Sequence, residues 1–277
     1  MEKAKDRLEV IERIKEYEKN GWWDRDVEND PPAKVLMPNE IDYLNKKLSS
    51  KIATSFANKA GTKFYENLIK NNQLIIKKVN GLENLLVIQG GAIITSNHFN
   101  VCDNYAIYRA MKPHYPKKFR LWKVIREGNY TNSPPPFGFI LRNCNTLPLS
   151  SSTETMKKFM RATSELLKRG EKILIYPEQG MWWNYRKPRP TKNGAYRLAV
   201  NNDVPVVPVF ITMEDSEFMG ADGFSIQAYT INFMPAIHPK RELSKKENIE
   251  YMQQENYRMC KECYEEFYKI PLTYGEE

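Results

Sequence analysis

The feature that most restricts the fold is a change of hydrophobic period near residue 74. From there on, short runs rich in β-branched and aromatic residues alternate with segments of helical period. The runs expected to form strands are "QLIIKKV", "LLVI", "AIITS", "FRLWKVI", "FGFIL", "NTLPL", "KILIYP", "VPVVPVFIT" and "SIQAYTINF". Helices are expected near residues 103–112, 153–169 and 193–202, with a charged helix over about 244–269. This alternation predicts the α/β class, with a mostly parallel mixed sheet flanked by helices.

Residues 1–73 are predicted to be a helical N-terminal extension of an α/β domain that occupies residues 74–277 and includes the C-terminal helix. A charged helix is expected over residues 3–19, with a stripe of Leu8, Ile11, Ile14 and Tyr17, and a loop should follow it. Asn39 is expected to cap a second helix, in which apolar residues recur every three or four positions: Ile41, Leu44, Leu48, Ile52 and Phe56. The segment "GTKFYENLIKNN" should continue as helix.

The net charge of +8 favours an anionic partner: a membrane surface, a nucleic acid or a phosphorylated substrate. No run approaches the roughly 20 apolar residues of a spanning helix, so contact with lipid is expected to be peripheral. The N-terminus lacks the apolar core of a signal peptide. The four cysteines, including the pair Cys260 and Cys263, fit neither a disulfide framework nor a zinc site. We therefore expect a cytoplasmic chain with reduced thiols.

The stretch "ITSNHFNVCDNY" places His98 directly after an expected strand and Asp103 five positions later, where a helix should begin. In α/β sheets the chemistry usually gathers at the carboxyl ends of the strands. One interpretation is catalytic, because a neutral imidazole can take a proton from a hydroxyl while a carboxylate orients its ring. The other is structural, with His98 at the helix start and Asp103 stabilised there by the helix dipole. The spacing alone leaves both open.

Four blocks of the sequence, in order, are similar to those of a known family. "NHFNVCD" resembles the N-H-x-x-x-x-D block of the glycerolipid acyltransferases, the enzymes related to lysophosphatidic acid acyltransferase. "FGFILRNCN" resembles the second block, an apolar run ending in Arg, and "ILIYPEQG" the third, which ends in Pro-Glu-Gly-Thr-Arg. "KNGAYRLAVNNDVPVVPVFI" resembles the fourth. Together they cover about residues 82–235, and the segments 1–73 and 244–277 lie outside the resemblance.

The resemblance implies acyl transfer from acyl-CoA or acyl carrier protein to a hydroxyl of a glycerol-phosphate or lyso-phospholipid acceptor, as in a bacterial 1-acylglycerol-3-phosphate acyltransferase. His98 matches the general base and Asp103 its orienting partner. Direct attack by the acceptor oxygen requires neither a metal nor another cofactor, and backbone N–H groups are expected to stabilise the oxyanion. The predicted substrate-binding residues are Asn97, Arg142, Glu178, Arg186, Lys187 and Lys192. The expected location is the inner face of the membrane, peripheral and bound through anionic lipid.

The third block departs from the family pattern, because Glu178 is followed by Gln179, Gly180 and Met181 and the Arg is missing. Cations further along, including Arg189, could reach back to replace it; alternatively, the acceptor head group differs from glycerol phosphate. A further alternative is a lipid- or acyl-carrier-binding protein without turnover.

Three aromatic residues, Trp182, Trp183 and Tyr185, lie beside these cations. They suit either a membrane interface or packing beneath the loop and along an acyl slot. Stacking on nucleic-acid bases has no supporting motif, and we expect no nucleic-acid partner.

Overall fold

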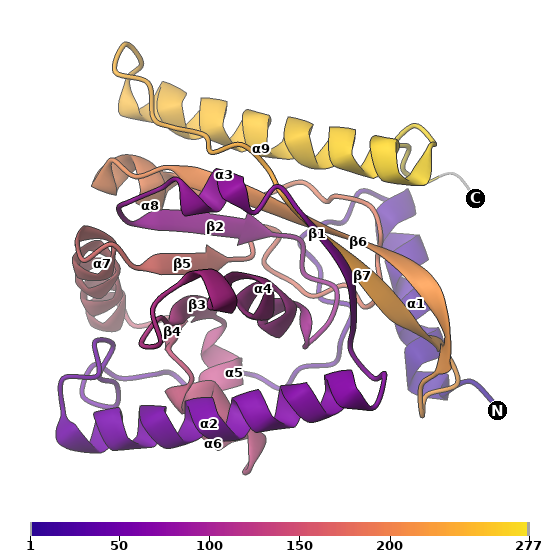
Figure 1. Cartoon of the computed structure of the whole chain (residues 1–277), viewed down its shortest axis with the longest axis horizontal. Coiled ribbons are helices and arrows are strands. Elements are labelled where there is room, and N and C mark those ends of the chain that lie inside the picture. Colours follow the sequence, from indigo (N-terminus) through magenta and orange to yellow (C-terminus); the bar gives the residue numbers. More distant parts are fainter. Residues whose placement is uncertain (1, 276–277) are drawn as a thin grey trace.

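The computed structural model describes residues 2–275, and a single seven-stranded sheet lies at its centre (Figure 1). The sheet order is β1-β7-β6-β2-β5-β3-β4, and every neighbouring pair is parallel except β6 and β7. The strands are β1 (Ile75–Asn80), β2 (Ala92–Ser96), β3 (Leu121–Ile125), β4 (Thr146–Pro148), β5 (Lys172–Ile175), β6 (Val206–Met219) and β7 (Ser225–Phe233). The predicted mostly parallel, mixed sheet is confirmed.

Helices cover both faces of this sheet. In β2, Ala92 and Ile94 face one core cluster, which includes α4, while Ile93 faces the other, which includes α7, α8 and α9. This alternation is the expected consequence of the two-residue period of a strand buried on both sides. The helices are α1 (Lys5–Lys19), α2 (Leu48–Lys70), α3 (Glu83–Leu86), α4 (Asp103–Met111), the 3₁₀ turn η1 (Lys112–His114), α5 (Glu127–Thr131), α6 (Phe137–Asn143), α7 (Thr153–Lys168), α8 (Gly194–Asn202) and α9 (Lys245–Tyr268).

Two predicted strands are helices instead. "FGFIL" forms α6, which starts after Pro136 and packs mainly against α2, with fewer contacts to the edge strand β4. The first two residues of "LLVI", Leu85 and Leu86, lie in the short helix α3, where Leu85 is the buried residue. Both are short, continuous apolar runs, and such runs carry no period that separates a strand from a helical turn.

The second predicted helix begins later than Asn39. Asn45 has a φ of 51°, in the left-handed region, and the Asp42 carboxylate accepts a hydrogen bond from the Lys47 N–H, so residues 41–47 form turns and α2 begins at Leu48. The apolar stripe of this helix faces solvent. The fully buried residues of α2 are Thr54, Ala57 and Gly61, whereas Leu48, Ile52 and Phe56 are exposed.

The N-terminal segment wraps around the α/β unit. In α1 the buried residues are Val10 and Ile14, whereas Leu8 of the predicted stripe is exposed. The segment then follows the edge strand β4, where the Tyr43 hydroxyl donates to the Pro148 carbonyl at 2.7 Å. The division of the chain at residue 73 stays a prediction, and residues 1, 276 and 277 of its two parts lie outside the described residues. Within residues 2–275, no helix is long and apolar enough to cross a membrane.

Candidate active site

His98 and Asp103 are in direct contact at the carboxyl end of β2. A short turn follows Ser96, and Asp103 is the first residue of α4. The Nδ1 atom of His98 lies 2.7 Å from Oδ2 of Asp103, which is fully buried, while the imidazole keeps partial access to solvent. The same Oδ2 accepts the backbone N–H groups of Phe99 and Asn100. Asp103 therefore serves both as partner of the imidazole and as acceptor at the start of α4, so the two interpretations of the spacing are compatible.

Tyr176 completes the surroundings of this pair, and sequence reasoning missed it. Its hydroxyl donates to Oδ1 of Asp103 at 2.5 Å, and its ring stacks on the His98 imidazole with centroids 4.0 Å apart. Burial, reinforced by the Asp103 charge, holds the pKa of the Tyr176 phenol well above its usual value of 10, so the phenol stays protonated and donates. The parallel pairing of β2 with β5 is the feature that could have revealed it. Thr95 pairs with Ile175, and this places the next residue, Tyr176, beside the turn that carries His98.

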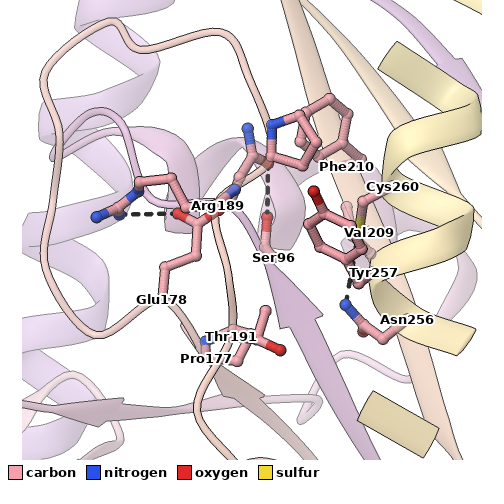
Figure 2. A pocket seen from close by; sticks show the side chains of 12 residues that line it. Ser96, Pro177, Glu178, Arg189, Thr191, Val209, Phe210, Asn256, Tyr257 and Cys260 are labelled. Carbon is pink, nitrogen blue, oxygen red and sulfur yellow. Dashed lines mark hydrogen bonds and ion pairs between the residues drawn. The ribbon is translucent and has the colours of Figure 1, made fainter. Parts of the chain in front are cut away.

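Glu178 holds the backbone of this turn. Its Oε2 accepts the His98 backbone N–H at 3.2 Å, and the same atom accepts from the Arg189 guanidinium at 2.8 Å. The Oε1 atom accepts the Arg189 backbone N–H at 3.0 Å. Figure 2 shows the two side chains facing each other beside a cavity of about 10 Å³, no larger than one water molecule. Both oxygens of Glu178 are thus bound by protein donors.

Asn97 is also bound by its own chain. Its side-chain amide donates to the Ile211 carbonyl at 3.0 Å and accepts the Ile211 N–H at 2.9 Å. This paired contact with β6 fixes the residue directly before His98. The contact continues the hydrogen bonding of β2 to β6 beyond Ser96, where the strand itself ends.

None of the four predicted substrate-binding cations contacts the His98 imidazole in the described part of the chain; each has other partners. Arg186 pairs with Asp215 at 2.8 Å, Lys187 with Glu18 at 2.5 Å and Lys192 with Asp24 at 2.5 Å. Arg142 donates to the backbone carbonyls of Tyr130 and Ser133. It lines a polar cavity of about 300 Å³ between α6, β4 and the loop before α2, whose lining residues do not include His98.

Comparison with known proteins identifies the family. The family model described as Acyltransferase matches residues 76–212, the segment that carries His98, Asp103, Tyr176 and Glu178. This segment belongs to the acyltransferase family. Among solved structures, it is similar to the crystal structure of the 1-acyl-sn-glycerophosphate (LPA) acyltransferase, PlsC, from Thermotoga maritima, with 20% identity, a TM-score of 0.48 and 81% of each chain covered. No curated protein matches this chain in sequence.

The aromatic residues after the third block are packed against the N-terminal segment rather than exposed. Trp182 is fully buried against Val10, Ile14 and Val27 of the N-terminal segment. It also stacks on Trp23, with ring centroids 5.5 Å apart. A membrane interface for Trp182 is therefore wrong, and packing beneath the loop is correct. Trp183 and Tyr185 are partly buried against the same cluster.

Tyr176→Phe tests the hydrogen bond to Asp103 without disturbing the stacked ring. The change leaves Oδ1 of a fully buried carboxylate without its side-chain donor, so the free energy of unfolding should fall by about 1–3 kcal/mol. Tyr115→Phe is the matched control, since the Tyr115 hydroxyl is buried without a partner among the described residues. Its removal should leave the stability unchanged or increase it. Urea unfolding at neutral pH measures the free energy of unfolding of both variants. An equal loss of stability in the two would contradict this role of Tyr176.

Proposed function

We propose that this protein transfers a fatty acyl group from acyl-CoA or acyl carrier protein to a hydroxyl of a glycerol-phosphate or lyso-phospholipid acceptor, as a 1-acylglycerol-3-phosphate O-acyltransferase does. The observation that carries the proposal is the contact between His98 and Asp103 at the carboxyl end of β2, in a segment of the acyltransferase family. Since Asp103 binds Nδ1, the other ring nitrogen, Nε2, is left to take a proton from a substrate.

The proposed reaction has two stages. Nε2 of His98 takes the proton of the acceptor hydroxyl while its oxygen attacks the thioester carbonyl, and the resulting imidazolium is stabilised by the Asp103 carboxylate. The tetrahedral intermediate then expels the thiolate, and the imidazolium returns the proton to it. The products are an ester and a free thiol, and the enzyme regains its starting state. The Tyr176 hydroxyl and two backbone N–H groups hold the Asp103 carboxyl group in place throughout.

The alternative is a binding protein that has lost turnover, and the altered third block was its only support. Arg189 compensates the Glu178 charge despite the missing Arg, so the altered block still holds the His98 turn. A binding protein has no need of an imidazole oriented by a buried carboxylate. These contacts favour the enzyme over the binding protein.

Replacing His98 tests the proposed base. His98→Ala should lower the turnover number about 10³-fold, because the base and the acid that serves the leaving thiol vanish together. Asp103→Asn should also lower the turnover number severely, since an amide can present a donor where the imidazole needs an acceptor. His114→Ala is the control, because His114 is exposed in η1. The measurement is thiol release from acyl-CoA or acyl carrier protein with a panel of lyso-phospholipids. Thiol release at the wild-type rate by His98→Ala would refute the assignment.

Arg142 is the strongest of the predicted cations for an acceptor phosphate. Arg186, Lys187 and Lys192 already have carboxylate partners. Within residues 2–275, Arg142 has carbonyl partners but no carboxylate at ion-pair distance, although Glu40 and Asp42 line the same cavity. A guanidinium in a polar cavity suits a phosphate, which it can bind through two parallel hydrogen bonds.

Arg142→Met should therefore raise KM for a phosphorylated acceptor by about 10-fold or more while changing the turnover number less, as expected for a contact made equally in ground and transition states. Lys192→Met should raise it less, since Asp24 already pairs with that charge. Steady-state kinetics with the acceptor and the acyl donor varied separately distinguish the two substrates. An equal rise in KM for both would assign Arg142 to the donor or to the fold.

For the membrane contact we propose the outer face of α2 together with α6, in place of the tryptophans. The exposed apolar residues of this surface are Leu48, Ile52, Phe56 and Phe64 of α2 and Phe137 and Phe139 of α6. Ring contacts join the two helices, with centroids of Phe56 and Phe139 6.1 Å apart and those of Phe64 and Phe137 5.8 Å apart. In Figure 1 the two helices lie side by side at the lower edge of the molecule.

Charge and position both favour an anionic lipid surface as the partner. The exposed lysines of α2 are Lys51, Lys59, Lys63 and Lys70, and in the described part of the chain none of them pairs with a carboxylate. Lysines flanking exposed aromatic residues on a helix are typical of binding in the plane of an anionic interface. The surface also reaches the active site, since Tyr65 of α2 contacts Val101, three residues after His98. This supports a peripheral location at the inner face of the membrane.

The double substitution Ile52→Ser and Phe56→Ser should weaken binding to vesicles that contain phosphatidylglycerol by about 10²-fold, because two apolar side chains no longer insert. The loss should persist at high salt, which screens the lysines but not the apolar contact. Val87→Ser and Ile270→Ser alter exposed apolar residues outside this surface and serve as controls. Sedimentation with vesicles measures binding, and the same loss in the controls would place the contact elsewhere.

A further inference from the structure

We propose, given the acyl transfer proposed above, that Arg189 is a positioning residue for His98. It acts through Glu178 on the backbone of the catalytic turn, and Trp182 connects this support to helix α1. Arg189 follows Glu178 by eleven residues and comes from the far end of the same loop.

The burial of Arg189 excludes a substrate, although Nη1 of its guanidinium has no hydrogen-bond partner among the described residues. The side chain is 1% exposed, and its guanidinium donates to Oε2 of Glu178 and to the Gly180 carbonyl. Its carbon Cζ lies over the ring of Trp182, 4.6 Å from the centroid. An acceptor phosphate cannot reach a cation enclosed in this way. The charge is directed inward, where it pairs with the buried Glu178 and fixes that side chain in one orientation.

The loop that carries this pair holds both backbone groups of His98. The His98 N–H donates to Glu178, and the His98 carbonyl accepts the Trp182 N–H at 3.1 Å. The next carbonyl, that of Phe99, accepts the Asn184 N–H at 3.0 Å. A shift of this loop therefore moves the imidazole relative to Asp103 and to any bound hydroxyl. A misplacement of about 1 Å can cost about 10²-fold in rate.

The N-terminal helix takes part through Trp182. This ring is fully buried between the Arg189 guanidinium and the cluster of Val10, Ile14 and Val27. Its Nε1 donates to the Arg25 carbonyl at 3.3 Å, which adds a polar tie to the N-terminal segment. A segment outside the matched residues 76–212 thus fixes the loop that fixes the catalytic turn.

The test compares Arg189→Met with Glu178→Gln and with the double variant, and uses Arg258→Met, an exposed arginine of α9, as control. Arg189→Met should lower the turnover number about 10²-fold with little change in either KM. In a protein that already carries Glu178→Gln, adding Arg189→Met should lower the turnover number little further, because Arg189 acts through Glu178. The double variant also removes the charge imbalance of the single ones, so it should unfold at a higher temperature than either.

A second readout needs no substrate. With three histidines in the chain, the imidazole signals can be assigned by NMR, and the Nδ1 proton shared by His98 and Asp103 should be visible in the wild type. It should broaden or vanish in folded Arg189→Met and persist in Arg258→Met. If the wild type transfers no acyl group but Arg189→Met loses this signal, the proposed function fails and the positioning role stands.

Two results would overturn the positioning role. One is an unchanged Nδ1 proton signal with a turnover number within about twofold of the wild type, which would make Arg189 a filler of the core. The other is a raised KM for the phosphorylated acceptor at an unchanged turnover number, which would make Arg189 a phosphate ligand. Additive losses in the double variant would break the proposed link to Glu178.

Discussion

The fully buried carboxylate of Asp103 is the group on which the arrangement of the site depends. A charge removed from water costs several kcal/mol unless donors surround it, and Asp103 receives four: the imidazole of His98, the hydroxyl of Tyr176 and the N–H groups of Phe99 and Asn100. These donors come from the turn after β2 and from the end of β5. The shape of the turn, the register of two strands and the start of α4 must therefore all be correct together for the charge to be tolerated.

This geometry explains how much of the site the sequence could reveal. The contact of His98 with Asp103 spans five residues, so the expected strand, turn and helix start were enough to predict it. Tyr176 is 73 residues from Asp103 and reaches it because β5 pairs with β2, a neighbour relation that no local pattern encodes. The ion pairs of the loop cations were hidden for the same reason. Lys187 meets Glu18 across 169 residues, so a charge that reads as free in the sequence is compensated in the fold.

The fold can be predicted from the sequence where the hydrophobic period of a segment is long and clear. The prediction fails where apolar runs are short or face solvent. Strands β2, β5 and β7 and helices α7 and α9 follow the predicted segments closely, whereas β6 extends beyond its predicted segment to Met219. The run that forms α6 was read as a strand because hydrophobicity was taken as a sign of the sheet, whereas Phe137 and Phe139 are exposed beside α2. The apolar residues that recur along α2, Leu48, Ile52 and Phe56, are exposed as well. An apolar period indicates a face, but not whether that face meets a core, a partner or a lipid surface.

The altered third block shows how the fold accommodates a sequence that differs from the family pattern. The family's glycine position is occupied by Gln179, whose φ of 70° lies in the left-handed region that glycine adopts most easily. The backbone turn is thus kept although the residue suited to it is absent, at a cost of about 1–2 kcal/mol. The Gln179 N–H donates to the Tyr176 carbonyl at 3.1 Å, which ties the turn to the end of β5. The strained turn directs Glu178 to His98 and lets the chain return with Arg189 behind it. With neither the Gly nor the Arg of the family pattern, this chain supports the turn through the backbone of Gln179 and the guanidinium of Arg189.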